Sequence, residues 1–93
     1  MKQSFHEHEG SGGILIIDDE QIVRDTLGNT LKRMSYEVFT ASDGREGIEM
    51  YLKNRKKIRG VFLDMIMPVM NGIETLAELK KLDAALPVVI ISG

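Results

Sequence analysis

Four short runs of aliphatic and β-branched residues alternate with three amphipathic segments along the chain. The runs lie at 14–17, 36–41, 61–64 and 88–91. The first and last of these runs contain no polar residue, which is typical of strands that are buried on both faces. Strands that alternate with helices join through right-handed crossovers and form a parallel sheet with helices on both faces. The sequence therefore predicts an α/β domain built on a doubly wound parallel sheet.

The three amphipathic segments predict helices. The first covers 21–34, the second runs from about Asp43 to Lys53, and the third opens at Asn71. Gly47 lies inside the second helix, where alanine would be more favourable by about 1 kcal/mol, so this helix is not expected to be very stable. The side chains expected to face the core are Val23, Leu27, Leu31, Met34, Ile48, Tyr51, Leu52, Ile73, Leu76, Ala77 and Leu79.

The composition is typical of one globular domain, because 43% of the 93 residues are hydrophobic and 28% are charged. The 12 basic and 14 acidic residues give a net charge of −2, which offers no electrostatic reason to expect a nucleic acid or an anionic membrane as partner. The absence of cysteine excludes disulfides and thiolate metal sites. The N-terminal segment contains no apolar stretch of the length found in signal peptides, so we expect a cytoplasmic protein.

The segment 1–13 ends in Gly-Ser-Gly-Gly and predicts a flexible leader, with the folded domain at 14–93. His6 and His8 stand two positions apart in this leader and suggest a metal site. Such a pair in a flexible segment is usually incidental. The basic segment 53–59 suggests a nucleic-acid patch. Cations also complement the dipole at the C-terminus of a helix, and we favour the interpretation that this segment is a solvent-exposed face.

Acidic residues stand at the ends of two predicted strands. Asp18, Asp19 and Glu20 follow the first strand, and Asp64 ends the third. Any one of them alone is most often a solvated loop residue, but the carboxyl ends of parallel strands meet at one edge of the sheet. If the first and third strands are neighbours, Asp18 and Asp19 lie beside Asp64, and the carboxylates repel one another unless a cation joins them. Oxygen donors without histidine or cysteine favour Mg²⁺.

A carboxylate beside bound Mg²⁺ can act as a nucleophile towards phosphorus, because the metal neutralises the charge that develops as an aspartyl phosphate forms. Ser92 follows the fourth strand and could donate its hydroxyl to the transferred phosphoryl oxygens. Four features coincide in the sequence: a double acid ends the first strand, a single acid ends the third, a hydroxyl-glycine pair ends the fourth, and Pro68 and Gly72 follow Asp64 at a characteristic spacing. This coincidence favours a functional site over separate solvated loop residues.

Three segments together resemble the receiver domain of two-component response regulators: "ILIIDDE", "VFLDMIMPVMNGIE" and "PVVIISG". The resemblance covers 14–93. It implies a flavodoxin-like (CheY-like) sheet with strand order 2-1-3-4, and a signalling switch that catalyses only its own phosphorylation and dephosphorylation. The phosphoryl donor would be a sensor histidine kinase or a phosphotransfer protein.

The resemblance also implies roles for single residues. Pro68 and Gly72 would shape the loop behind Asp64. Asp64 would be the phosphoacceptor. Asp19, Asp64 and the backbone carbonyl of Ile66 would bind Mg²⁺ directly, and Asp18 would bind it through a water molecule. Ser92 would be the switch hydroxyl, and Gly93 the small residue next to it.

The sequence departs from the family pattern at Gly93, after which receivers continue with a helix, a fifth strand and a last helix. The family's lysine and aromatic residue on the fifth strand have no counterpart here, and the terminal carboxylate adds negative charge near the site. We therefore expect this chain to be phosphorylated slowly or not at all. Without a fifth strand, 88–91 becomes an open sheet edge, which predicts a dimer or higher assembly.

Two other interpretations differ in class. The chain could be a non-catalytic module that self-associates or binds a partner through the edge strand at 88–91. It could also be a flavin-binding relative of flavodoxin, but the loop after the first strand is acidic and lacks the hydroxyls and glycines that would cradle a phosphate. Met65, Met67 and Met70 suggest a partner surface, although methionine more often fills gaps in a core.

Overall fold

The computed structural model describes residues 12–91, so the predicted leader, except for its last two residues, lies outside the described residues, as do Ser92 and Gly93. The predicted alternation of strands and helices is confirmed. The elements in chain order are β1 (Gly13–Ile17), α2 (Gln21–Arg33), β2 (Glu37–Ala41), α3 (Gly44–Lys53), β3 (Ile58–Asp64), α4 (Gly72–Leu82) and β4 (Val88–Ile91). No helix in the described range is both long and apolar enough to cross a membrane.

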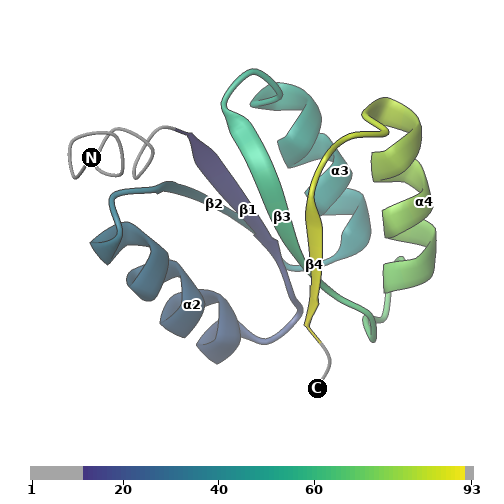
Figure 1. Ribbon diagram of the computed structural model, residues 1–93. Coiled ribbons are helices and arrows are strands. Elements are labelled where there is room, and N and C mark those ends of the chain that lie inside the picture. Colours follow the sequence, from purple (N-terminus) through teal and green to yellow (C-terminus); the bar gives the residue numbers. More distant parts are fainter. Residues whose placement is uncertain (1–11, 92–93) are drawn as a thin grey trace.

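The four strands form one parallel sheet in the order β2-β1-β3-β4. Helix α2 covers one face, and α3 and α4 pack together on the other (Figure 1). In the sheet register, Ile17 of β1 lies opposite Leu63 of β3. The residues that follow, Asp18 and Asp64, therefore emerge side by side at the carboxyl edge. The doubly wound fold and the strand order 2-1-3-4 are confirmed.

Strand β1 is buried on both faces because successive side chains meet different helices. Ile16 faces Gly28 of α2, whereas Ile17 faces Gly47 of α3. A Cβ atom added at Gly47 would lie 2.5 Å from Cδ1 of Ile17. The glycine that helix propensity marks as unfavourable therefore allows α3 to approach the sheet closely. The expectation that this helix is not very stable rests on propensity alone and stays a prediction.

The strand β3 begins three residues earlier than predicted, at Ile58 instead of Val61. Ile58 is buried and lies opposite Gly13, with an irregularity in the register directly after that pair. The prediction included Ile58 in the basic segment 53–59, because lysine and arginine residues stand on both sides of it. The lysines and arginines of 53–59 are all exposed, and Lys57 lies 3.8 Å from Glu37, which agrees with a solvent-exposed face.

Helix α4 is rotated relative to the prediction. Ile73, expected in the core, has 69% of its surface exposed, whereas Thr75 and Leu79 are fully buried. The hydroxyl of Thr75 donates to the carbonyl of Asn71 at 2.8 Å, so a polar side chain fits the core without an unpaired donor. The other expected core side chains that the structure places at the surface are Met34, Leu52 and Ala77. Met67 is buried, which agrees with a packing role.

Candidate functional site

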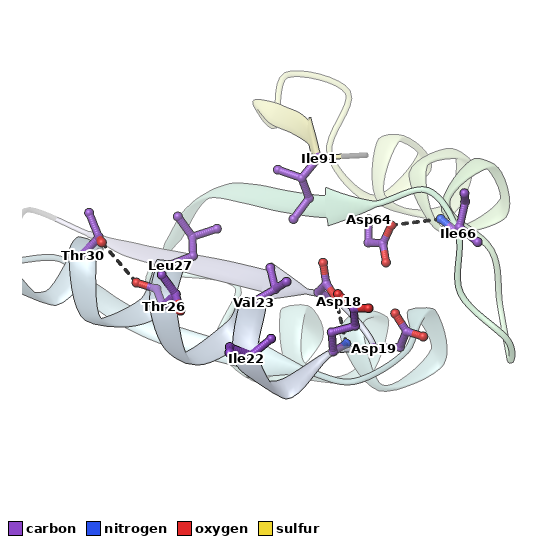
Figure 2. A pocket seen from close by; sticks show the side chains of 11 residues that line it. Asp18, Asp19, Ile22, Val23, Thr26, Leu27, Thr30, Asp64, Ile66 and Ile91 are labelled. Atoms are coloured by element: carbon purple, nitrogen blue, oxygen red, sulfur yellow. Dashed lines mark hydrogen bonds between the residues drawn. The ribbon is translucent and has the colours of Figure 1, made fainter. Parts of the chain in front are cut away.

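Three carboxylates gather at the carboxyl edge of the sheet, where β1 and β3 end (Figure 2). Asp18, Asp19 and Asp64 each offer one oxygen atom, and these atoms all lie within 4.8 Å of one another. Asp18 and Asp64 are only 5% and 7% exposed, whereas Asp19 reaches solvent. The strand order explains the cluster, because β1 and β3 are hydrogen-bonded neighbours. The predicted meeting of these three acids is confirmed.

Backbone amides fix the two buried carboxylates. The amide of Glu20 donates to Oδ1 of Asp18 at 2.8 Å, and the amide of Ile66 donates to Oδ1 of Asp64 at 3.0 Å. Each bond spans two residues, so each acid is held by the loop that follows its own strand. Such bonds orient a carboxylate while leaving its negative charge in place. Within residues 12–91, no lysine or arginine forms an ion pair with the cluster.

The surroundings of Asp64 disfavour the negatively charged form of its side chain. Burial raises the pKa of Asp64, and the negative charges of Asp18 and Asp19 raise it further. The amide bond from Ile66 acts in the opposite direction, but the pKa remains above its ordinary value of 3.8. A cation at this position would relieve both the desolvation and the repulsion. Three hard oxygen donors of this kind fit Mg²⁺.

The loop behind Asp64 depends on a glycine. A Cβ atom at Gly72 would lie 2.4 Å from the Cα atom of Met65 and 2.8 Å from the carbonyl oxygen of Asp64. The amide of Gly72 donates to the carbonyl of Met65 at 3.0 Å. The first turn of α4 therefore packs directly on the backbone that carries Asp64. Pro68 lies exposed in the same loop.

A pocket of about 640 Å³ opens beside the three acids, between α2 and β4 (Figure 2). Ile66, the predicted carbonyl ligand, lines it close to Asp64. Ser92 and Gly93, predicted to follow β4 at this edge, lie outside the described residues. The other lining residues are Glu20, Ile22, Val23, Thr26, Leu27, Thr30 and Ile91.

The sequence pattern predicted no role for Arg24. Its guanidinium Nη1 donates to the backbone carbonyl of Asp18 at 2.7 Å, and the side chain is half-buried. The only signal in the sequence is its place in the first turns of a helix that follows two acids. That signal does not distinguish a bond to the loop from a solvated cation.

Comparison with known proteins decides the family. The family model described as the response regulator receiver domain matches residues 14–93. The chain belongs to the response regulator receiver family. It is therefore a phospho-accepting signalling module of two-component systems, and not an enzyme in the strict sense.

Individual relatives agree with this receiver assignment. Response regulator MprA of Mycolicibacterium vanbaalenii is 33% identical over 80 residues, covering 86% of this chain and 34% of the relative. Chemotaxis protein CheY of Thermotoga maritima is 35% identical over 81 residues, covering 86% of this chain and 66% of the relative. The CheX–CheY–BeF₃–Mg²⁺ complex of Borrelia burgdorferi includes a chain with a TM-score of 0.83 and 30% identity, covering 87% of this receiver and 61% of that chain. This receiver thus spans about a third of the length of the MprA relative.

Proposed function

We propose that Asp64 accepts a phosphoryl group from a sensor histidine kinase or a phosphotransfer protein, in a reaction that requires Mg²⁺. One observation carries this proposal: in a chain of the receiver family, oxygen atoms of Asp18, Asp19 and Asp64 lie within 4.8 Å of one another. The proposed ligands of the metal are Asp19, Asp64 and the carbonyl of Ile66, with Asp18 acting through water. When bound, Mg²⁺ supplies positive charge that offsets the carboxylates and the phosphoryl oxygens.

The chain itself positions the nucleophile. The amide of Ile66 holds Oδ1 of Asp64, and β3 fixes the backbone, so the second oxygen remains available at the carboxyl edge of the sheet. That oxygen forms a bond to phosphorus while the bond from phosphorus to the donor breaks and the donor keeps the electron pair. Burial of Asp64 limits competing water, and the raised pKa reflects the desolvation that a cation would offset.

Related structures support the use of Mg²⁺. The Borrelia burgdorferi CheY complex contains Mg²⁺ and BeF₃ together with the protein CheX. The likeness of that chain to this one extends over 87% of this receiver. We therefore propose the same metal here, and a protein partner that either delivers the phosphoryl group or responds to it.

The residues beyond β4 complete the proposal. Ser92 is proposed as the switch hydroxyl and Gly93 as the small residue beside it, on the support of the family match to residue 93. The proposed domain boundaries are a leader at 1–13 and a receiver at 14–93, supported by the start of that match. Strand β1 begins one residue before this boundary, at Gly13. A cytoplasmic location is proposed on the basis of family membership alone.

Acetyl phosphate tests the acceptor directly. The chain is incubated with acetyl phosphate and Mg²⁺, and its intact mass is followed over time. We expect the added mass of one phosphoryl group in the wild type and in Asp25→Asn, an exposed control on α2, and none in Asp64→Asn. Equal labelling of wild type and Asp64→Asn would contradict the acceptor assignment.

A second candidate function is supported by the exposed side of β4, which among the strands of residues 12–91 pairs only with β3. Val89 and Ile90 are 49% and 44% exposed, and Ile91 of the same strand lines the pocket between α2 and β4. For the 93-residue polypeptide we propose self-association through this edge. Light scattering should show a mass that rises with concentration in the wild type and falls to the monomer in Ile90→Lys. A monomeric wild type at high concentration would exclude this module.

A further inference from the structure

We propose that Arg24 is a positioning residue for the acidic site: its hydrogen bond to the carbonyl of Asp18 holds the β1–α2 loop in the conformation that gathers the three carboxylates. The inference rests on the proposed function, because it concerns the affinity of that same site for Mg²⁺. Arg24 does not itself contact any of the carboxylate oxygens through a hydrogen bond that the structure records. Its action would be entirely through the backbone of Asp18.

Asp18 is held from three directions. Its amide donates to the carbonyl of Ala41 at 3.1 Å, which ties the end of β1 to β2. Its Oδ1 accepts the amide of Glu20 at 2.8 Å, and its carbonyl accepts Nη1 of Arg24 at 2.7 Å. Arg24 provides the only one of these three partners that is a side chain. It can therefore be removed by substitution while the acids and the backbone remain unchanged.

The start of α2 explains why the loop needs this support. Glu20 occupies the N-cap position of α2, but its side chain makes no capping hydrogen bond. The first backbone bond of the helix runs from the amide of Arg24 to the carbonyl of Glu20 at 3.2 Å. Arg24 thus fixes the loop twice, through its amide at Glu20 and through its side chain at Asp18. The guanidinium is a donor, so it does not cap the first amides of the helix as a side-chain acceptor would. It ties the loop to α2 at a helix start that has no side-chain cap.

The charge of Arg24 and its positioning role predict opposite effects on the affinity of the site for Mg²⁺. A guanidinium bound to the backbone of Asp18 adds positive charge near the site, which by Coulomb repulsion weakens the binding of a cation. If charge were the main effect, removal of Arg24 would tighten Mg²⁺ binding. If Arg24 acts by positioning, its removal weakens binding, as the loss of outer-shell support commonly does in metal sites. The sign of the change therefore separates the two effects.

The test measures Mg²⁺ affinity by isothermal titration calorimetry in four forms of the full chain. These are the wild type, Arg24→Met, Arg24→Lys, and Arg33→Met as a matched control in the exposed last turn of α2. Arg24→Met should weaken Mg²⁺ binding by about tenfold. Arg24→Lys should recover most of the loss, because an ammonium group can donate to the same carbonyl. Arg33→Met should bind Mg²⁺ like the wild type.

The results separate failure of the inference from failure of the proposed function. If the wild type binds Mg²⁺ and Arg24→Met binds it equally or more tightly, the positioning role is wrong and the site stands. If the wild type binds no Mg²⁺, the proposed function fails and the positioning role fails with it. Proton–nitrogen NMR spectra without metal provide a second readout. Arg24→Met should shift the amides of Asp19 and Glu20 and leave the amide of Ile66 in place; unshifted loop amides would overturn the inference.

Discussion

Helices α2 and α4 both begin at the carboxyl edge of the sheet, but their first turns are built differently. At α4, the side chain of Asn71 accepts the amide of Glu74 at 2.9 Å, and Oε1 of Glu74 accepts the amide of Asn71 at 3.2 Å. This reciprocal capping box satisfies the helix locally. At α2, three acids precede the helix and none of them caps it by a side-chain bond to its first turn.

At the start of α4 the polar side chains cap the helix, whereas at the start of α2 they belong to the acidic site. The acids before α2 have the chemistry of good caps, yet Asp18 and Asp19 are turned towards Asp64. A sequence that breaks a local rule at one place usually does so at a functional site. The start of α2 is such a place, whereas the start of α4 follows the rule and supports the site through Gly72.

The largest expected effect concerns the close approach of α4 to β3. Gly72→Ala should lower the free energy of unfolding by about 3 kcal/mol, because the added methyl group would meet the backbone of Met65 and Asp64, which cannot move aside. The matched control is Gly60→Ala in β3, where the nearest atoms to a new Cβ lie 3.6 and 3.7 Å away. Urea denaturation should show a change within about 1 kcal/mol for this control. Equal stability of both variants would show that the packing at Gly72 is not tight.

A smaller effect tests the caps themselves. Asn71→Ala should lower the free energy of unfolding by about 1 kcal/mol, because α4 loses its side-chain cap. Glu20→Ala, at the same position of α2, should change it by less than about 0.5 kcal/mol, since no side-chain cap is lost there. Urea denaturation of the two variants provides the comparison. A loss at Glu20 as large as that at Asn71 would remove the distinction between the two helix starts.

The smallest expected effect is electrostatic and depends on pH. Because the pKa of Asp64 is raised above 3.8, the folded chain holds this proton more tightly than the unfolded chain does. The stability contributed by Asp64 is therefore present at acidic pH and is lost as pH rises through the folded pKa. In metal-free buffer, Asp64→Asn should be more stable than the wild type at pH 7, and the gap should close below pH 3.8.

Thermal unfolding across this pH range, with Asp25→Asn as the exposed control, measures the gap. The amide of Ile66 can still donate to the oxygen of an asparagine, so the substitution removes the charge and keeps that hydrogen bond. A gap that is constant with pH would mean that neither the burial of the Asp64 charge nor its repulsion by the other acids affects stability.

The fold could be predicted because its signals are local and periodic. The apolar run before Asp18 and the alternation of strands and helices together limit the topology to a parallel sheet, and the sheet then brings Asp18 and Asp64 to one edge. The three acids of the cluster could be named for the same reason, because they stand at the ends of β1 and β3.

The remaining features depend on contacts between distant residues, which periodicity does not contain. The buried position of Thr75 in place of Ile73 follows from the way Gly72 sets α4 on β3. The bond from Arg24 reaches back six residues to a backbone carbonyl, and any arginine on an amphipathic helix would have the same pattern. Gly47 has an unfavourable helix propensity. Its contribution, which is to let Ile17 of β1 pack against α3, depends on a contact that the sequence pattern does not contain.

Thermal unfolding with and without Mg²⁺ tests the central claim most directly, namely that the three gathered carboxylates form a metal site around Asp64. The account predicts that the midpoint of the wild type and of Asp25→Asn rises with the logarithm of Mg²⁺ concentration, while that of Asp64→Asn stays nearly constant. An equal rise in all three proteins, or no rise in the wild type, would contradict it.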